Sequence, residues 1–358
     1  MTSLYESFGR PFLFRVDAER AHQLSIAALK AGVHPKLKAE CDKRLEVKIA
    51  GLTFPNPLGM AAGYDKDAEV PDALLSMGFG HVETGTVTPR PQPGNPKPRI
   101  FRLVRDDAVI NRFGFNSVGH DAAKARLLAR KQRGIVGANI GANKDSEDFA
   151  ADYVIGIHAF DGIANYMTAN ISSPNTPGLR GLQLADPLAD LLSRIGEARE
   201  ASGSTCPVFL KIAPDLDEAE MDAIVKALDG SGFDGLIVSN TTLSREGLKS
   251  SNRDETGGLS GAPLFKRSTI VLARMRQRLG PDFPLIGVGG VSGAKTAFSK
   301  IEAGADLVQL YTGMIYRGPG LPGSVMRGLS NILDREEMAS ISEAKGRLTE
   351  EWAKCAVV

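Results

Sequence analysis

Eight short apolar segments alternate with helical segments along most of the chain, and this alternation limits the folds that the sequence can adopt. A helix between two strands brings the chain back to the end of the sheet where the first strand began, so the next strand runs parallel to it. The pattern therefore predicts an α/β fold with a parallel sheet. Eight units favour a (β/α)8 TIM barrel, and a doubly wound sheet is the alternative. The segments, mostly flanked by Gly, Pro or Asn, are Pro57–Ala62, Gly80–Thr86, Ile135–Asn139, Tyr166–Asn170, Val208–Ile212, Gly235–Ser239, Leu285–Val288 and Ala305–Tyr311.

The helical patterns between these strands have the spacing of amphipathic helices. Two long Gly- and Pro-rich interruptions, 88–115 and 240–263, follow the second and sixth strands. Long ordered loops after barrel strands are where binding sites are built, so we expect both to contribute to a site. The expected helices include Ala68–Ser76, His120–Arg133, Pro187–Ala201, Glu218–Leu228, Leu264–Leu279 and Ala294–Ala303.

The first 44 residues have a different character from the barrel region. Asp17 is placed to cap a helix over Ala18–Lys30, which Gly32 and Pro35 end. Segments 45–49 and 52–54 flank Ala-Gly and predict a small hairpin that opens the next unit. We therefore divide the chain into an N-terminal helical segment (1–44), a barrel (45–336) and a C-terminal helical tail (337–358).

Composition excludes several classes of protein. The chain of 358 residues carries 43 basic and 42 acidic side chains, a balance that argues against general electrostatic binding of nucleic acid. Three distant cysteines, Cys41, Cys206 and Cys355, indicate no disulfide framework and favour a reducing compartment. The N-terminus does not resemble a secretory signal, and no run of about 18 apolar residues predicts a membrane span. Association with a membrane surface stays open.

Polar residues follow the predicted strands, and few of them are carboxylates. Lysine, asparagine, serine and threonine at these strand ends suit a neutral or anionic heteroaromatic ligand. A divalent metal would need carboxylate or imidazole ligands, and the five histidines are scattered, so no metal site is predicted. Lys66 and Lys211 could stabilise negative charge on a ligand or could simply be solvated. Asn111, Asn175 and Asn240 are either turn residues or amide contacts to a ring.

The run Gly287-Val288-Gly289-Gly290 follows an apolar strand and precedes a helix. Backbone N–H groups without Cβ atoms nearby form a phosphate cradle in such a position, and barrels commonly place this cradle after strands seven and eight. Residues 311–313, Tyr-Thr-Gly, would complete it. A plain tight turn is the alternative for this run.

Nearly the whole chain resembles the quinone-dependent (class 2) dihydroorotate dehydrogenases, which are flavoproteins of pyrimidine synthesis. Small departures are Ser117, where this family commonly has another Asn, and Tyr64, where Leu or Phe is usual. The matching runs are DAERAHQL (17–24), PNPLGMAAGYDKD (55–67), ETGTVTPRPQPGNPKPRIFRL (83–103), NRFGFNSVG (111–119), NIGANK (139–144), NISSPNTPGLR (170–180), KIAPDL (211–216), SNTT (239–242), GGLSGAPL (257–264) and GVGGV (287–291).

This resemblance implies a cofactor, a substrate and a set of residues for each. Dihydroorotate would be oxidised to orotate, and its contacts would be Lys66, Asn111, Arg112, Phe113, Gly114, Phe115, Asn170, Asn175, Asn240 and Thr241. FMN would be held by Ala62, Gly63, Tyr64, Asp65, Lys66, Thr86, Asn139, Asn170, Lys211, Ser239, Gly261, Gly290, Tyr311 and Thr312.

The resemblance also implies the catalytic groups. Ser173 matches the base that removes the C5 proton of dihydroorotate while C6 passes hydride to the flavin, and Thr176 and Phe115 resemble a proton relay and a gate. The cytosolic class 1 relatives have cysteine in place of this serine. A free serine hydroxyl ionises poorly near neutrality, so it needs a closed site and a route for its proton. Without the resemblance, Ser172-Ser173-Pro174 would be interpreted as a polar turn.

The electrons must leave the flavin, and the sequence has no NAD fingerprint or iron–sulfur cysteine cluster. The resemblance implies that the N-terminal segment is a two-helix lid that admits a quinone tail from the bilayer, with His22 and Arg102 at the quinone site. Residues 1–40 carry six basic and four acidic side chains, mildly favourable for an anionic surface. We therefore expect a peripheral protein on the cytoplasmic side of the cell (inner) membrane. The alternatives are a helical cap over the barrel bottom and, for the whole chain, a non-catalytic barrel that binds a phosphate ligand.

Overall fold

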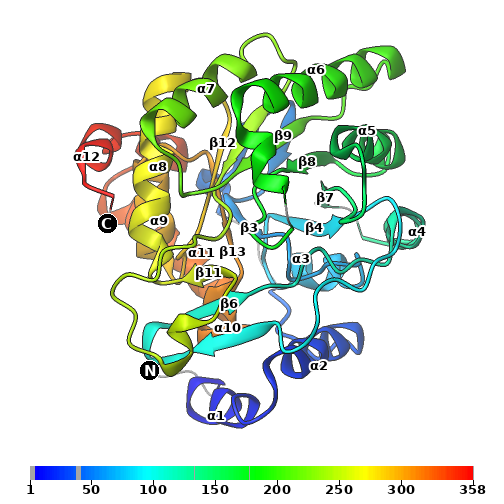
Figure 1. The fold of residues 1–358 in the computed structure, drawn as a ribbon. Helices are drawn as coiled ribbons and strands as arrows, with labels where there is room; N and C mark the ends of the chain where they lie inside the picture. The colour runs from blue at the N-terminus through cyan, green and yellow to red at the C-terminus, as the bar shows by residue number, and fades with distance from the viewer. Residues whose placement is uncertain (1–4, 38–41, 133, 177, 358) are drawn as a thin grey trace.

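The computed structural model is a closed parallel barrel surrounded by helices (Figure 1). It describes residues 5–37, 42–132, 134–176 and 178–357. Strands that follow one another in the sequence are neighbours around the barrel, and the last pairs with the first. The predicted TIM barrel is confirmed, and the doubly wound sheet is wrong. The strands are β3 (Leu58–Met60), β4 (His81–Val87), β7 (Ile135–Ile140), β8 (Tyr166–Asn170), β9 (Val208–Ile212), β10 (Gly235–Val238), β12 (Leu285–Val288) and β13 (Leu307–Leu310).

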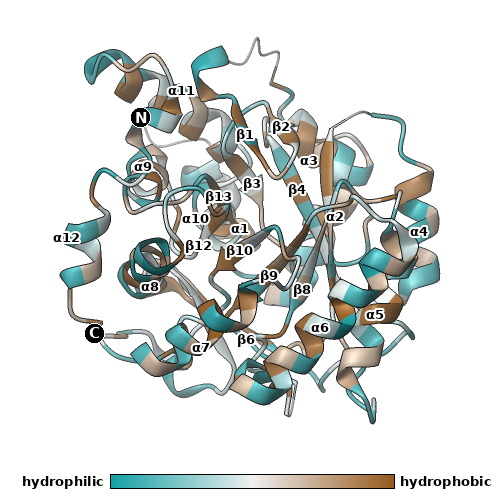
Figure 2. Cartoon of the chain, turned by 90° about the horizontal axis from the view of Figure 1, so that it is seen from above, coloured by the Kyte–Doolittle hydropathy of each residue, from teal (hydrophilic) through white to brown (hydrophobic). Residues whose placement is uncertain are grey.

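The helices pack around the barrel through one apolar side. In α11, Leu321, Val325, Leu329 and Ile332 recur at helical spacing and are all buried. Figure 2 shows the same two-sided character in α5 and α6, which carry both hydrophobic and hydrophilic colours. The helices around the barrel are α3 (Pro71–Ser76), α4 (His120–Leu128), α5 (Phe149–Phe160), α6 (Ala185–Ser202), α7 (Glu218–Leu228), α8 (Leu264–Leu279), α9 (Ala294–Glu302), α10 (Thr312–Arg317) and α11 (Leu321–Arg335).

Two helices are shorter than the sequence pattern predicts by three residues or more, and a buried or half-buried aspartate explains each of these ends. α3 begins at Pro71 rather than at Ala68, because the Asp65 carboxylate accepts hydrogen bonds from the backbone N–H groups of Glu69 and Val70. α4 ends at Leu128, and Asp72 then binds the Arg130 side chain and the backbone N–H groups of residues 131 and 132. Arg133, the last residue of the predicted helix, lies outside the described residues.

The two long interruptions form a small sheet that the sequence pattern did not predict. β5 (Ile100–Leu103), β6 (Ala108–Asn111) and β11 (Gly258–Gly261) are antiparallel in the order β11-β6-β5. β11 comes from the second interruption, so the sheet joins segments about 150 residues apart, for example Asn111 opposite Gly258. Leu103, Ile110 and Leu259 give this sheet an apolar cluster of its own. The sheet therefore carries Asn111 to the carboxyl end of the barrel.

A hairpin packs at the amino end of the barrel. β1 (Val47–Ile49) and β2 (Leu52–Phe54) pair antiparallel, as the sequence predicts. The ring of Phe54 meets the edge of His81, the first residue of β4, at a centroid distance of 5.3 Å. At the other end of the chain, 3-10 residues Ile341–Ala344 and α12 (Thr349–Lys354) follow α11, and Trp352 packs its ring against Phe265 of α8.

The N-terminal segment lies beside the carboxyl ends of the barrel strands. A π-helical turn (Tyr5–Gly9), α1 (Arg10–Leu13) and α2 (Ala18–Lys30) form it, and Asp17 caps α2 as predicted. Tyr64, which follows β3, donates a hydrogen bond to Ser25, and Tyr5 donates to the carbonyl of Ile315. The alternative of a cap over the barrel bottom is therefore wrong. Among the described residues, no helix is long and apolar enough to cross a membrane.

A buried ion pair ties α2 to the loop before β5. Arg99 Nη2 and Nε lie 2.8 and 3.1 Å from the two carboxylate oxygens of Glu19, and both side chains are about one-tenth exposed. Burial alone would raise the pKa of Glu19, but hydrogen bonds and charge from Arg99, and then Lys97, hold it below its ordinary value. Arg99 also donates to the carbonyls of Pro93 and Asn95, so one guanidinium organises helix and loop together.

Replacing Glu19 by Gln should loosen the N-terminal helices, because it leaves the Arg99 charge buried without its carboxylate. Breaking a buried pair costs about 3–5 kcal/mol, and we expect the lower end because Arg99 keeps two carbonyl partners. Hydrogen exchange of residues 18–30 should accelerate accordingly. Lys30→Gln is the control: it changes another residue of α2, whose exposed pair with Glu69 before α3 is lost, and should change little. Equal exchange in both variants would contradict this account of docking.

Candidate functional site

A cavity of about 1140 Å³, including its open mouth, lies at the carboxyl end of the barrel; we call it the polar cavity because lysine, asparagine, serine and threonine side chains belong to its wall. The loops after most barrel strands contribute to its wall, together with β5, β6 and β11. This gathering follows from parallel strands, whose carboxyl ends all meet at one rim. The wall consists of Ala61, Ala62, Gly63, Lys66, Thr86, Ile100, Val109, Asn111, Phe113, Gly114, Phe115, Asn116, Asn170, Ser173, Asn175, Lys211, Ser239, Asn240, Thr241, Ser260, Gly261, Leu264, Val288, Gly289, Gly290, Val291, Leu310, Tyr311, Thr312, Gly313 and Ile315.

A fully buried carboxylate lies inside the barrel beneath this cavity. Glu83 of β4 accepts hydrogen bonds from Asn139 (2.7 Å), Gln309 (2.9 Å) and Tyr166 (3.3 Å), and the Lys211 ammonium lies 3.7 Å away. A charge without these partners would be costly to bury. Lys211 is itself 4% exposed, so the pair fixes its ammonium at the cavity floor.

Side-chain amides continue this network from the interior to the cavity wall. Asn170 donates to Thr86 Oγ1 at 2.8 Å and to Asn139 Oδ1 at 3.2 Å. The side-chain oxygen of Asn170, Oδ1, accepts hydrogen bonds from Asn240 Nδ2 at 3.1 Å and from Ser172 Oγ at 3.2 Å. These bonds join β4, β7 and β8 to the loops after β8 and β10. Amide orientations are therefore set before any ligand binds.

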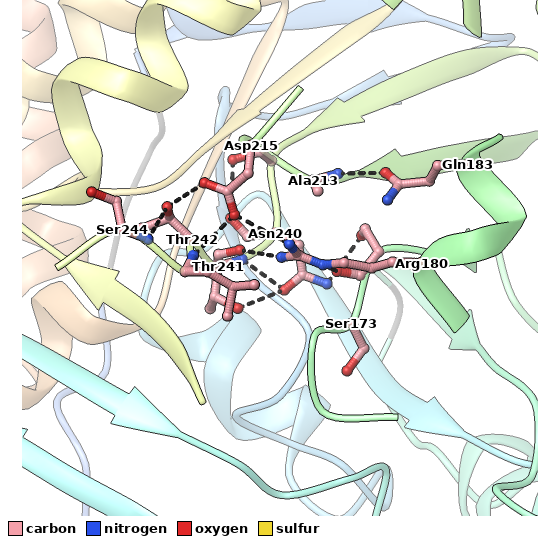
Figure 3. Close-up of polar contacts among 12 residues, drawn as sticks. Ser173, Arg180, Gln183, Ala213, Asp215, Asn240, Thr241, Thr242 and Ser244 are labelled. Atoms are coloured by element: carbon pink, nitrogen blue, oxygen red, sulfur yellow. Dashed lines mark hydrogen bonds and ion pairs between the residues drawn. The ribbon is translucent and has the colours of Figure 1, made fainter. Parts of the chain in front are cut away.

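Ser173 lies in the loop after β8 and is 5% exposed. Its Oγ accepts a hydrogen bond from the backbone N–H of Asn175 at 3.3 Å, and the side chain points away from the polar cluster around Arg180 (Figure 3). Thr176 is equally buried, and its Oγ1 makes no hydrogen bond to another described residue. The segment thus holds one hydroxyl at the cavity wall and a second with free hydrogen-bonding capacity behind it.

Lys66 faces the cavity from the loop after β3. Its Nζ donates to Asn116 Oδ1 at 2.5 Å and lies 3.2 Å from the centre of the Phe113 ring. Burial lowers the pKa of this ammonium to about 7, and the positive charge of Arg99 acts in the same direction. An anion bound next to Lys66 would favour the protonated form.

The segment 111–116 is held in place from outside the cavity. The side-chain N–H groups of Gln92 donate to the carbonyl of Phe115 at 2.8 Å, and those of Asn95 to the carbonyls of Arg112 and Asn175. Asn175 also donates to Asn111 Oδ1 at 3.3 Å, so two predicted substrate residues on different loops meet. Phe115 adopts a φ of +51°, which indicates that its neighbours impose the conformation.

The glycine run after β12 forms one corner of the cavity. Gly289 and Gly290 have φ values of +106° and +72°, and a Cβ on Gly290 would lie 2.4 Å from Cβ of Phe265. Behind this turn, the fully buried Lys300 donates to Ser268 and Thr269, and Ser268 in turn donates to the carbonyl of Gly289. Burial lowers the pKa of Lys300 to about 7. A cation behind a side-chain-free turn suits an anionic group.

A second cavity, apolar and of about 1130 Å³ including its mouth, lies between the N-terminal helices and the barrel. Ile100, Val109, Tyr311 and Ile315 line both cavities, so the two share a wall. His22 and Arg102 line the second cavity only; Tyr311 O–H and His22 Nδ1 are 3.4 Å apart. Burial lowers the pKa of His22 to about 4, with the charge of Lys66 adding to the effect, so its imidazole is neutral at pH 7.

Comparison with known proteins identifies the family. Residues 44–333 match the family model for dihydroorotate dehydrogenase. Proteins named dihydroorotate dehydrogenase (quinone) from Brucella ovis and Brucella canis are each 64% identical over 99% of this chain and 98% of theirs. A crystal structure of DHODH from Eimeria tenella in complex with ferulenol is 40% identical, with a TM-score of 0.88 over 92% of this chain and 95% of that chain.

The chain belongs to the dihydroorotate dehydrogenase family. The resemblance inferred from the sequence is therefore confirmed, including the quinone-dependent class that its relatives' names state. Ligand-free DHODH from Eimeria tenella matches equally well, with a TM-score of 0.87 over 92% of this chain and 99% of that chain.

Most of the FMN, substrate and catalytic residues inferred from resemblance to dihydroorotate dehydrogenases line the polar cavity, but five do not. Asn139 and Thr176 lie buried behind the wall. Tyr64 lines the apolar cavity instead, and the Asp65 carboxylate accepts hydrogen bonds from the backbone N–H groups of Glu69 and Val70, just before α3. Arg112 turns outward, where it pairs with Glu255 at 2.6 Å and stacks over Phe101. For Tyr64, Asp65 and Arg112 the side chains therefore do not support direct contact with a ligand in the polar cavity.

The structure places four further residues at the polar cavity that the sequence did not indicate. Asn116 and Ser260 line the cavity, and Glu83 and Gln309 anchor its floor. A carboxylate within the apolar segment 80–86 was the available signal for Glu83, and Asn116 belongs to the same NRFGFN run as Asn111. Among the residues that the structure describes, no three His, Cys, Asp or Glu side chains are grouped to hold a metal ion.

Proposed function

We propose that this protein oxidises dihydroorotate to orotate in pyrimidine synthesis, using FMN as the hydride acceptor and a membrane quinone as the final electron acceptor. Membership of the dihydroorotate dehydrogenase family supports the oxidation of dihydroorotate. The observation that supports the cofactor and the quinone acceptor is that a polar and an apolar cavity share one wall. Such a wall suits an enzyme whose two substrates differ in polarity and exchange electrons through one cofactor.

The polar cavity has the donors that FMN requires. The glycine turn at 289–290 presents backbone without side chains, and the buried Lys300 ammonium behind it suits a phosphate. Lys211, fixed by Glu83, suits negative charge on a flavin ring, which accepts hydride and passes electrons on when bound. The residues that would hold FMN are Ala62, Gly63, Lys66, Thr86, Asn170, Lys211, Ser239, Gly261, Gly290, Tyr311 and Thr312.

Amide groups and one ammonium form the proposed substrate site. Dihydroorotate carries a carboxylate and a ring with alternating carbonyl and N–H groups, which side-chain amides can match with both donors and acceptors. Asn111, Asn175 and Asn240 supply those amides. Asn175 donates a hydrogen bond to Asn111 Oδ1, and Asn240 donates one to Asn170 Oδ1, so their side chains are held in place. Lys66 supplies positive charge for the carboxylate. The aromatic ring of Phe113, which lies against the Lys66 ammonium, restricts the directions in which that ammonium can point.

Ser173 is the proposed base. Its Oγ would accept the C5 proton of dihydroorotate, and because a serine hydroxyl already holds a proton, that proton must leave through a neighbour. Burial of the Ser173 loop excludes bulk water, and the hydrogen bond from the Asn175 N–H orients Oγ. Thr176 Oγ1 has free hydrogen-bonding capacity and could relay the proton outward. Phe115, also at the wall, would restrict solvent entry.

The apolar cavity is the proposed quinone site, and its mouth is the proposed membrane contact. Exposed apolar side chains surround this region, with Phe12 67%, Leu24 47% and Val33 72% exposed. Leu24 and Val33 also line the cavity, so an isoprenoid tail could pass from lipid to the interior without crossing water. Neutral His22 and the Tyr311 hydroxyl offer hydrogen bonds to a quinone carbonyl. We propose peripheral attachment to the cytoplasmic side of the cell (inner) membrane through these helices.

The first experiment tests the oxidation itself. Purified protein should be yellow, and dihydroorotate should bleach it without oxygen, because the bound cofactor is reduced. Ser173→Ala should keep the colour but bleach about 10²- to 10⁴-fold more slowly, the usual contribution of a positioned base. Ser173→Cys should recover part of the rate, since a thiol with an unperturbed pKa of about 8.5 ionises more readily. Bleaching of Ser173→Ala at the unmodified rate would remove Ser173 from the mechanism.

Orotate binding should weaken as pH rises from 6 to 8.5. Lys66 has a pKa of about 7 in the free protein, so below that pH its ammonium is already charged. Above that pH, Lys66 must take up a proton when orotate binds, and this uptake weakens binding. Lys66→Met should bind orotate about 10- to 150-fold more weakly, equivalent to about 1.5–3 kcal/mol, and with a flatter pH profile. Lys144→Met, which changes an exposed lysine outside the cavity wall, is the control. Identical pH profiles for wild type and Lys66→Met would refute this assignment.

Two adjacent alanines test the quinone site. Ala28 lines the apolar cavity, whereas its neighbour Ala27 is exposed and does not. Ala28→Phe should slow reoxidation by a long-tailed quinone at least tenfold, because the added ring occupies the tail's space, while dihydroorotate still bleaches the protein. Ala27→Phe should leave both steps unchanged. If the two variants reoxidise alike, the quinone does not use this cavity.

A further inference from the structure

One arginine joins the loops that follow three consecutive barrel strands (Figure 3). Arg180, after β8, donates through Nε to the carbonyl of Ser172 at 3.3 Å and through Nη2 to the carbonyl of Thr241, after β10, at 3.1 Å. Its Nη1 lies 3.2 Å from Asp215 Oδ2, in the loop after β9. The guanidinium therefore uses all three of its nitrogens on different loops.

Asp215 extends the connection along the loop after β10. Thr242 Oγ1 donates a hydrogen bond to Asp215 Oδ1, and the backbone N–H of Leu243 donates to Oδ2 at 2.9 Å. Arg267 Nη1 is 3.8 Å from Oδ1. The Asp215 side chain is about one-fifth exposed and that of Arg180 about one-quarter, so water screens this pair less than an exposed one.

Neither residue lines the polar cavity. Arg180 donates to Thr241, which does line it, and Asp215 acts through its contacts with Arg180 and Thr242. Ser172, bonded by Arg180, precedes Ser173, and Thr241, bonded on the other side, follows Asn240. Asn240 also donates to Ser172 Oγ at 3.1 Å, so the loops after β8 and β10 contact each other directly as well as through Arg180. The position of the Ser173 hydroxyl relative to the Asn240 amide therefore depends on Arg180 and Asp215.

We propose that Arg180 and Asp215 are positioning residues that set the distance and angle between the proposed base and the substrate amides. The inference rests on the proposed function, because it assumes that Ser173 removes a proton from a ring held by Asn240. An error of about 1 Å in such placement can reduce a rate about 10²-fold. Arginine suits this role because its planar fork holds three acceptors at fixed angles, which a lysine ammonium cannot do.

The loop has a separate anchor, so variants of this pair can fold. Gln183 Oε1 accepts a hydrogen bond from the backbone N–H of Ala213 at 2.9 Å, and Leu179 is fully buried. These contacts attach the 3-10 turn Leu179–Gln183 to the end of β9 without Arg180. The proposed FMN contacts also lie outside the pair, so cofactor content reports on folding independently of positioning.

The test compares Arg180→Lys and Asp215→Asn with wild-type holoenzyme. Flavin reduction by dihydroorotate should slow about 10²-fold in Arg180→Lys and less in Asp215→Asn, whose single amide oxygen can still accept from one of the two donors, Thr242 or Leu243. The dihydroorotate KM should rise by a smaller factor than kcat falls. The isotope effect of deuterium at C5 should increase in both variants, because proton removal becomes slower. The double variant should be less than additive, since both changes break one connection.

Arg194→Gln is the matched control, because Arg194 pairs with Asp148 away from the cavity wall. It should match wild type. The proposal is overturned if Arg180→Lys reduces flavin within threefold of wild type with an unchanged isotope effect. It is also overturned if the slower rate simply follows loss of FMN or a lower melting temperature. Wild-type holoenzyme that dihydroorotate cannot bleach would instead refute the proposed function, so the two failures are distinguishable.

Discussion

The buried charge of Glu83 is the constraint on which the site depends. A carboxylate inside a barrel is tolerated only when donors surround it, and here they come from β7, β8, β9 and β13. Lys211 is fixed as a consequence, and Asn139 passes the network on through Thr86 and Asn170 to Asn240. The cavity is thus the outer end of a hydrogen-bonded column that begins in the barrel core, and its amides need little reorganisation when a ligand binds.

The second constraint is the division of the carboxyl end into two environments. The antiparallel sheet of β5, β6 and β11 and the N-terminal helices build the partition, with Ile100 and Val109 lining both cavities. The Glu19–Arg99 pair holds α2 against the loop that leads into β5. In the proposed function, dihydroorotate and the quinone approach one cofactor from these two different sides. This second, apolar cavity gives the N-terminal helices a role in the proposed function, because they form one of its walls.

Local sequence patterns predicted the parts of the fold that local physics decides. Eight strands, the hairpin at Ala50-Gly51 and the Asp17 cap are all present, because apolar runs, turn residues and caps act over a few neighbours. The sheet of β5, β6 and β11 was not predicted, since Asn111 and Gly258 pair only after the barrel has brought their loops together. The early end of α4 depends on Asp72, more than 50 residues away. The outward turn of Arg112 depends likewise on Glu255.

We propose that the two cavities, which share one wall, carry two half-reactions through one cofactor. The most direct measurement is sequential anaerobic mixing of yellow protein, first with one equivalent of dihydroorotate and then with one equivalent of a long-tailed quinone. We predict complete bleaching followed by complete return of colour, with excess orotate failing to slow the second step. Colour that does not return with quinone, or a second step that orotate blocks competitively, would contradict the claim.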